Sequence, residues 1–289
     1  VTETDPQILE ELRKPVSVEW EYGINAQYVS ENKEEFDAML EGRRSKLVSF
    51  DPKSREVMAM AVRNVLGLPK SQISDEAALL KVLDPVQNPL LADVFETGIV
   101  DPLSQTAEMV NFVFADIISH AGDSQRQRHR TTPGATAPLE SLFDGTMDSF
   151  VPMIVKENPE LSERFLEITK KIVENVNRCI DSGMPKTAAL SLLPNSQNIR
   201  LVESGNLLNR IHRMKSRLCL NAQEEIFFND LEQARQIVEV FPETRKVLRA
   251  PCGLRKDIGE KPPCPEGKRY CGQRMWMEPI ENYQLKRVL

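Results

Sequence analysis

The spacing of apolar residues predicts helices over much of this chain. Asp51 and Pro52 are typical of a helix start, and Gly67 and Pro69 are typical of its end. Between them, apolar residues recur at helical intervals. They are Val57, Met60, Ala61 and Val65. The pattern therefore predicts a helix across this stretch.

Two longer regions show the same period. Residues 161–182 predict an amphipathic helix whose acidic and basic side chains lie opposite its apolar ones. Its apolar side consists of Phe165, Ile168, Ile172 and Val176. Residues 204–240 are also mainly helical in pattern, and residues 73–83 and 89–96 predict shorter helices.

Strands are less clearly marked. A small sheet is expected at residues 46–50, with residues 108–118 as its candidate second strand, although the apolar run 108–120 suits a helix equally well. Residues 131–138 contain two prolines and a glycine and predict a loop. These patterns together predict an α+β fold that is predominantly helical, with a small central sheet.

The pattern divides the chain into three parts. Residues 1–44 predict an N-terminal arm that begins with a charged, irregular surface segment. Residues 45–249 form the main domain, and residues 250–289 form a Cys-rich C-terminal tail of that domain.

Composition is that of a folded, acidic protein. The 289 residues are 40% hydrophobic, and 37 basic against 43 acidic side chains give a net charge of −6. This charge argues against a protein that coats nucleic acid, so no nucleic-acid partner is expected. The first residues lack the pattern of a secretory signal, and no apolar run approaches the roughly 18 residues of a membrane span. We therefore expect a soluble, cytoplasmic protein without a membrane partner.

The cysteines point to a metal rather than to disulfides. The chain has 5, an odd number, and none precedes residue 179. Cys252, Cys264 and Cys271 lie in a tail rich in Pro and Gly, with Cys219 upstream. Four thiolates would complete a tetrahedral structural zinc site that orders the tail, and buried free thiols are the alternative. Cys179 is expected in the core.

A basic cluster at residues 125–131 stands apart in this acidic chain. Arg128 and Arg130 offer guanidinium groups that bind phosphate oxygens bidentately and stay charged. The loop that follows can add backbone N–H groups at Gly134 and Ala135, where an anion can approach the main chain. A solvated or salt-bridged basic face is the alternative.

The stretch from Asn206 to Arg217 carries two stripes on a predicted helix. One is apolar and expected to be buried. It consists of Leu207, Leu208, Ile211, Met214 and Leu218. The other is cationic. It consists of Asn206, Arg210, Arg213 and Arg217, with Asn209 and His212 at its edges. The cationic stripe predicts either a face that binds an anionic, hydrogen-bonding ligand or an exposed face paired with glutamates.

Both cationic segments resemble parts of the flavin-dependent thymidylate synthase family. The family signature begins with Arg-His-Arg and has a Gln three residues earlier, as at Gln125 and Arg128-His129-Arg130 here. The second half of the family pattern also matches this chain, at the family's spacing and without a gap. It consists of Leu193-Pro194, Asn206, Arg217 and Ala222-Gln223-Glu224-Glu225-Ile226. The resemblance covers roughly residues 45–245.

The resemblance implies a reaction and its cofactors. A one-carbon unit would pass from methylenetetrahydrofolate to C5 of a pyrimidine nucleotide, dUMP, with FAD as cofactor and NADPH as reductant. The family's enzymes are homotetramers whose active sites lie between subunits, so a homotetramer is expected.

The resemblance also implies roles for individual residues. Those expected to contact FAD are Arg128, His129, Arg130, Asn206 and His212. Gln125 and Arg217 would face the pyrimidine, and Arg217 would be the catalytic group, because it stays cationic while charge develops on the uracil. Gly134 and Ala135 would bind the nucleotide through backbone N–H groups.

The chain departs from the family pattern mainly on the nucleotide side. Residues that are Ser, Asn, Glu, Ser, Arg and Tyr in the family are replaced. The residues here are Pro133, Ala135, Thr136, Pro138, Glu140 and Ser141. Leu190 stands where the family has an Arg that holds the nucleotide phosphate. These changes support a second hypothesis, a catalytically inactive or repurposed flavin- or nucleotide-binding homologue that acts as a structural or regulatory subunit.

The tail supports a third hypothesis, a protein that binds RNA or DNA through a zinc-ordered basic segment. Its basic residues are Arg255, Lys256, Lys268, Arg269 and Arg274.

Overall fold

The computed structural model describes residues 6, 10, 26–93 and 97–286. The start of the predicted arm and the end of the predicted helix at 89–96 fall outside the described residues. The second half of the arm forms helix α2 (Ala26–Leu40). Polar contacts hold α2 to the body. The Arg200 guanidinium donates to both carboxylate oxygens of Asp37 at 2.8 and 2.6 Å, and Lys33 donates to Asp144 at 2.6 Å.

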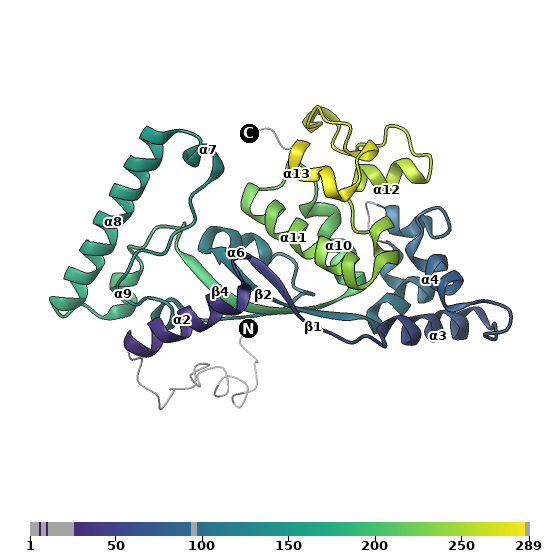
Figure 1. The fold of residues 1–289 in the computed structure, drawn as a ribbon, viewed down its shortest axis with the longest axis horizontal. Coiled ribbons are helices and arrows are strands. Elements are labelled where there is room, and N and C mark those ends of the chain that lie inside the picture. The colour runs from purple at the N-terminus through teal and green to yellow at the C-terminus, as the bar shows by residue number, and fades with distance from the viewer. Residues whose placement is uncertain (1–5, 7–9, 11–25, 94–96, 287–289) are drawn as a thin grey trace.

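An antiparallel sheet runs through the centre of the molecule (Figure 1). In spatial order its strands are β1 (Ser45–Phe50), β2 (Asn111–Ser119), β4 (Asn198–Asn206) and β3 (Gly134–Thr136). The predicted α+β fold with a small sheet is confirmed, and the ambiguous run at 108–120 is mainly a strand. The loop expected at 131–138 is partly wrong, because its middle residues pair with β4 as an edge strand.

The sequence did not predict β4. A half-buried strand usually alternates apolar and polar residues. In β4, however, the charged side chains of Arg200 and Glu203 are buried together with Ile199 and Leu201. Charged residues at buried positions hide the alternation, so no strand pattern is visible.

Helices α10 (Leu207–Arg217) and α11 (Glu224–Val240) pack on one face of the sheet (Figure 1). The apolar stripe predicted for this region is confirmed, since all of its side chains are at most 4% exposed. The core between these helices and the sheet includes Phe112 and Phe114 of β2 and Phe227 of α11. This packing fixes the ends of both helices relative to the strands.

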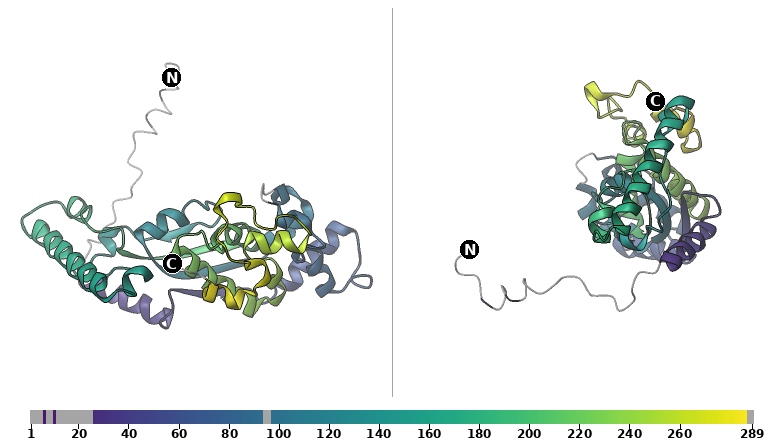
Figure 2. Two further views of the ribbon diagram at one scale, coloured as in Figure 1. Left: turned by 90° about the horizontal axis from the view of Figure 1, so that it is seen from above. Right: turned by 90° about the vertical axis from the view of Figure 1, so that its left-hand side faces the viewer.

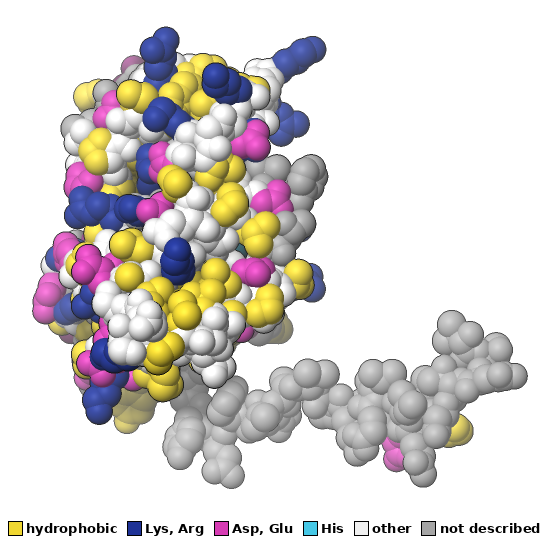
Figure 3. Space-filling view, turned by 90° about the vertical axis from the view of Figure 1, so that its right-hand side faces the viewer, with side chains coloured by type: hydrophobic (Ala, Val, Ile, Leu, Met, Phe, Trp, Pro, Cys, Tyr) yellow, Lys and Arg dark blue, Asp and Glu magenta, His cyan; other side chains and the backbone are white. Residues whose placement is uncertain are grey.

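Helices α3 (Ser54–Leu66) and α4 (Asp75–Leu83) pack against each other at one end of the molecule. The helix predicted between Asp51 and Gly67 is confirmed as α3, whose buried side chains include Met58, Ala59 and Val62, whereas Met60 is 59% exposed. Residues 57–62 are all apolar, so the period cannot select a face, and packing against α4 decides. Figure 3 views this end and shows hydrophobic side chains interspersed with charged ones.

Helix α8 (Pro159–Asp181) lies at the opposite end of an elongated molecule (Figure 2). The long helix predicted from the pattern is confirmed. Its inner side is only partly apolar, with Thr169, Val173 and Val176 buried, while Ile168 is 48% exposed.

The other helices are short. The α-helices are α5 (Pro102–Gln105), α6 (His120–Arg126), α7 (Met153–Lys156), α9 (Lys186–Leu190), α12 (Pro251–Asp257) and α13 (Tyr283–Lys286). The 3₁₀ turns are η1 (Pro89–Ala92), η2 (Thr97–Val100), η3 (Thr106–Met109), η4 (Leu139–Ser141), η5 (Pro242–Lys246), η6 (Gly267–Arg269), η7 (Met275–Met277) and η8 (Ile280–Asn282). No helix in the described ranges has the length and apolar content that a bilayer crossing requires.

Candidate functional site

Two segments that are distant in sequence meet at the side chain of Arg217, the last residue of α10. Its Nε donates to Nε2 of His129 at 3.1 Å, across 88 residues of chain. Its Nη2 donates to the main-chain oxygen of Gln125 at 2.9 Å. The structure therefore brings the basic cluster at 125–131 and the end of α10 into direct contact.

The basic cluster is held in shape by the end of α6 and the turns that follow. Ser119 caps this helix by accepting a hydrogen bond from the backbone N–H of Gly122 at 3.0 Å. After the helix, the main-chain oxygen of His129 accepts from both the N–H and the hydroxyl of Thr132, at 3.1 and 3.0 Å. Asn209 of α10 adds a bond from its side-chain amide to the Thr131 oxygen at 3.2 Å.

The three arginines of the basic cluster differ in what surrounds them. Arg126 is 4% exposed and donates to Asp123 at 2.7 Å. Arg128 and Arg130 are exposed, and neither forms an ion pair with any residue that the structure describes. These two guanidinium groups are therefore available to an external anion. Arg126 instead has a structural role, which the position of Asp123 three residues earlier could have indicated.

His129 is a neutral imidazole at physiological pH. Burial and the positive charges of Arg217 and Arg213 together lower its pKa to about 4, and the opposing effect of Glu203 is smaller. Because Nε2 accepts a hydrogen bond from Arg217, the ring proton belongs on Nδ1. The ring lies edge-on to that of His212, with centroids 5.7 Å apart. The site thus contains a neutral His129 ring, with its proton on Nδ1, beside the positively charged Arg217.

This environment predicts a pH effect on stability. The unfolded chain binds a proton at His129 as pH falls below about 6.5, whereas the folded chain does so only near pH 4. The folded state therefore loses stability as pH decreases through this window, and above it the effect is absent. His129→Gln should reduce the loss in free energy of unfolding between pH 7 and pH 5, measured by urea denaturation. The exposed His120, changed to Gln, is the control. An equal loss in all three proteins would contradict the prediction.

Asn206 joins the end of β4 to the start of α10. Its side-chain oxygen accepts from the backbone N–H of Asn209 at 2.9 Å and so caps the helix. The cap uses the amide oxygen and fixes the direction of the amide nitrogen. A structural role for Asn206 is therefore compatible with a contact to a ligand at the same helix end.

The cationic stripe expected on α10 is not a continuous ligand-binding face. Arg210 and Arg213 are both fully buried, and both pair with the carboxylate of Glu203, at 2.5 and 2.7 Å. Arg213 also pairs with Asp230 of α11 at 2.6 Å. The expectation that the whole stripe faces a ligand or solvent is wrong for these two residues, because two buried carboxylates neutralise them. Arg217, half-buried, is the arginine of the stripe that reaches the basic cluster.

Glu203 stands at the centre of this buried polar network. Burial alone would raise its pKa, but the adjacent Arg213 and Arg210 guanidinium groups outweigh burial and hold the pKa well below its usual range. The nearby Asp116 of β2 accepts from Gln233 at 3.1 Å, and burial together with the charge of Glu203 raises its pKa to about 7. The network fixes the buried side of α10 from which Arg217 extends.

The expected anion-binding positions Gly134 and Ala135 lie in β3. The Ser204 N–H donates to the Pro133 oxygen at 3.0 Å, and Ala135 pairs with Val202. This register directs the Ala135 N–H toward β4 and leaves the Gly134 N–H pointing away from the sheet. A Cβ at Gly134 would lie 2.6 Å from Nη1 of Arg126, which explains why glycine occupies this position.

The Ala-Gln-x-Glu-Ile segment has a structural role that the sequence did not indicate. The side-chain oxygen of Gln223 accepts from the Ile226 N–H at 3.0 Å and caps α11. Glu225 is 2% exposed and accepts from the Ser119 N–H at 2.8 Å and from Arg44 at 2.8 Å. This segment therefore ties α11 to the start of α6, the helix that carries Gln125.

An open cleft lies beside Arg217. It is lined by Ser216, Arg217, Cys219, Asn221, Ala222, Glu266 and Arg269. Glu266 and Arg269 come from the tail, and Asn221 holds that part of the tail by donating to the Arg269 oxygen at 2.7 Å. The contribution of Arg269 to the site has no signal in the sequence, because only the fold brings residue 269 near residue 217.

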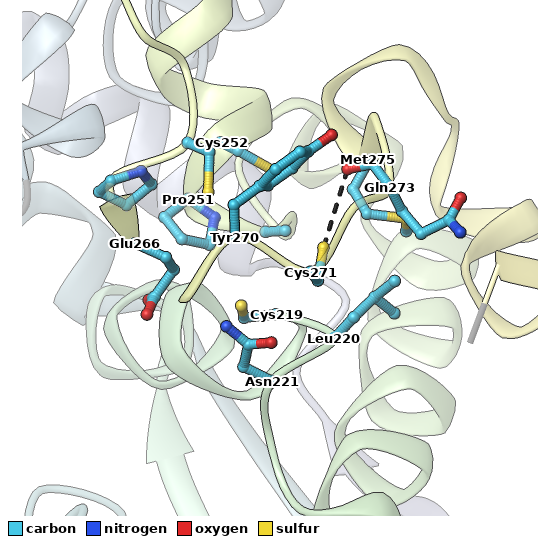
Figure 4. A pocket seen from close by; sticks show the side chains of 13 residues that line it. Cys219, Leu220, Asn221, Pro251, Cys252, Glu266, Tyr270, Cys271, Gln273 and Met275 are labelled. Atoms are coloured by element: carbon cyan, nitrogen blue, oxygen red, sulfur yellow. Dashed lines mark hydrogen bonds between the residues drawn. The ribbon is translucent and has the colours of Figure 1, made fainter. Parts of the chain in front are cut away.

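Four cysteines line a second cavity next to this cleft (Figure 4). They are Cys219, Cys252, Cys264 and Cys271. Burial and the neighbouring thiols raise the pKa of Cys252 to about 12, and burial raises that of Cys219. No group of three or more His, Cys, Asp or Glu side chains within the described ranges already has a metal-binding arrangement. Cys179 lies apart, in α8.

The chain matches the model of a known protein family. The model of a family described as thymidylate synthase complementing protein matches residues 46–243. No curated protein matches the chain. The matched residues include α6, β4, α10 and α11, and therefore both segments that meet at Arg217.

Proposed function

Because this chain belongs to the thymidylate synthase complementing protein family, a family of flavin-dependent thymidylate synthases, we propose that it methylates a uridylate at C5. The donor is methylenetetrahydrofolate, the cofactor is FAD, the reductant is NADPH, and the nucleotide is dUMP. The observation that carries the proposal is the contact of Arg217 with His129 and Gln125, which joins the two motif blocks in one site.

The residues available at the basic cluster fit FAD. Arg128 and Arg130 offer exposed guanidinium groups without ion-pair partners in the described part of the chain, which suits the two phosphates of the cofactor. His129 offers a neutral ring with a fixed tautomer, and Asn206 and His212 lie on α10 or at its start. When bound, FAD supplies the redox chemistry and carries the one-carbon unit.

Gln125 and Arg217 are proposed to hold the pyrimidine. Nε and Nη2 of Arg217 are used by His129 and Gln125, while Nη1 has no hydrogen-bond partner among the described residues. This nitrogen can therefore donate to a uracil carbonyl oxygen on which negative charge develops. The arginine does not titrate near neutral pH, so its charge is present throughout turnover, even though burial lowers its pKa.

The nucleotide phosphate needs a site that differs from the one in the family. Leu190, which stands in place of the family's arginine, is 2% exposed within an apolar cluster and cannot bind phosphate. We propose that Gly134 contributes its outward backbone N–H and that Ala135 next to it shapes the edge of this site. Arg269, in the cleft beside Arg217, is the proposed cationic contact.

A homotetramer in the cytoplasm completes the proposal. The site is open toward solvent, and Arg128 and Arg130 are exposed, as expected where another subunit covers the cofactor. Both co-substrates are metabolites of the cell interior.

The buried Leu190 favours one alternative function, a homologue that binds flavin or nucleotide without catalysis. Two experiments separate the hypotheses. The absorption spectrum of the purified protein reports bound flavin, and tritium release from 5-labelled dUMP, with methylenetetrahydrofolate and NADPH, reports catalysis. Flavin with robust release supports the enzyme. Flavin without release supports the inactive homologue, and a colourless protein that takes up no FAD contradicts both.

The double variant Arg128→Ala, Arg130→Ala should bind FAD more weakly by about tenfold to a hundredfold, because each change removes a charge-assisted contact. The measurement is the dissociation constant for FAD, from quenching of flavin fluorescence. Arg164→Ala, an exposed arginine on α8, is the matched control and should leave it unchanged. Unaltered affinity in the double variant would remove these residues from the cofactor site.

A further inference from the structure

We propose that Cys219, Cys252, Cys264 and Cys271 together bind one Zn²⁺ ion, which holds the C-terminal tail against the end of α10. The four residues come from two distant parts of the chain and line the same cavity. Figure 4 shows the sulfur atoms of Cys219, Cys252 and Cys271 facing a common space. The inference does not depend on the proposed function, since it concerns only these four side chains.

The position of each cysteine suits a shared ligand set. Cys219 lies two residues after the last residue of α10, and Cys252 lies in the first turn of α12. Cys264 and Cys271 lie in the irregular segment after α12, on either side of η6. Gly272, with a φ of +78°, allows a tight turn immediately after Cys271. Such turns let a short loop present a sulfur atom without a long secondary-structure element behind it.

The chemistry of the cavity favours a soft cation. Its remaining walls are largely apolar or uncharged, and no Lys, Arg or His lines it. Thiolates gathered there would have no counter-ion from the protein, and Glu266 adds a further negative charge. A divalent cation supplies that charge, and Zn²⁺ is stable with four thiolates in a tetrahedron. Binding would deprotonate the four thiols and draw their sulfur atoms together.

The tail has few other interactions to order it. Between α12 and α13 it contains only 3₁₀ turns. Tyr270 and Trp276 stack beside the cavity with ring centroids 5.9 Å apart, and Met275 and Ile280 anchor the following residues. After the buried Leu254 in α12, residues 255–274 contain no buried apolar anchor of that kind, and a metal would supply the missing link.

The ion would have a consequence for the candidate active site. Cys219 lies two residues after Arg217, and Glu266 and Arg269 of the same tail segment line the cleft beside that arginine. The metal would therefore fix one wall of the cleft. Its role is to position these residues, and it does not contact the reacting atoms.

Metal analysis of the purified full-length chain tests the proposal. We expect about one zinc per chain in the wild type, removed by Cys271→Ser and by Cys264→Ser. Cys179→Ser, which changes a cysteine outside the cavity, should retain it. Absence of metal from wild type, zinc content unaffected by Cys271→Ser and Cys264→Ser, or iron with sulfide in place of zinc would each overturn the proposal.

If the serine variants do not fold, the zinc site can still be tested on the wild-type protein. Titration with an organomercurial in the presence of a chromogenic chelator should release the zinc as about four thiols react. Cobalt substitution should give the visible bands of tetrahedral cobalt thiolate. Disulfides between these cysteines, seen by thiol counting under denaturing conditions, would refute the site. None of these readouts involves flavin or dUMP, so failure here is distinguishable from failure of the proposed function.

Discussion

Glu203→Ala should destabilise the folded chain by about 3–5 kcal/mol, or prevent its folding, because it leaves the buried Arg210 guanidinium without a carboxylate and removes one of the two carboxylates that pair with Arg213. Glu203 is fully buried and accepts hydrogen bonds from Arg210 at 2.5 Å, from Arg213 at 2.7 Å and from Gln233 at 3.0 Å. Arg213 keeps Asp230, whereas the hydrogen bonds that Arg210 retains among the described residues are those to Gln233 and, at 3.4 Å, to the Phe112 oxygen.

The measurement is the free energy of unfolding from chemical denaturation at neutral pH. Glu108→Ala, an exposed glutamate elsewhere in the chain, is the control and should change stability by less than about 0.5 kcal/mol. Glu203→Gln keeps the shape and two hydrogen-bonding groups but removes the charge, so we expect a loss between those of the other two variants. Near-wild-type stability of Glu203→Ala would show that the network does not hold α10 on the sheet.

The sequence predicted the elements whose buried positions are apolar better than the strand that contributes Glu203 to this network. The apolar stripe of α10 follows the helical period closely, since all of its side chains are buried, and the extent of α8 is also predicted by the period. The buried side of α8 is only partly apolar, however, because it includes Thr169 while Ile168 is 48% exposed.

Strand β4 does not follow the strand period, since Arg200 and Glu203 occupy buried positions. Their partners lie on other elements. Asp37 of α2 and Gln233 of α11 are distant in sequence, and Arg210 and Arg213 of α10 meet Glu203 only because the chain reverses direction between β4 and α10. No pattern within the strand itself therefore marks these residues as buried.

The candidate site was also only partly predictable from the sequence. The resemblance named Gln125, His129 and Arg217 for one site, and the structure brings them into hydrogen-bonding contact. The helical period alone gave no reason to separate Arg217 from Arg213, which has the same residue type and lies on the same stripe. Only the positions of Glu203 and Asp230 separate a buried structural arginine from one that faces the cleft.

Arg217→Ala should lower kcat/KM for dUMP methylation by about a hundredfold to a thousandfold, while flavin remains bound. The reason is that the proposed contact of Nη1 with the uracil carbonyl strengthens as negative charge develops there. Removing a group that acts mainly in the transition state lowers kcat more than it raises KM. The measurements are steady-state tritium release and flavin content. Arg164→Ala on α8 is the matched control.

A purely structural role for Arg217 predicts a different result. The residue bridges His129 and Gln125, so its loss could reduce activity simply by loosening the basic cluster. Arg217→Lys separates the two roles, because lysine keeps the charge but lacks the planar fork that reaches both partners. If charge stabilisation dominates, Arg217→Lys should recover at least tenfold of the activity that Arg217→Ala loses, since the cation remains near the uracil. If positioning dominates, both variants should lose flavin and activity together, and Arg217 would then act through His129 and not on the substrate.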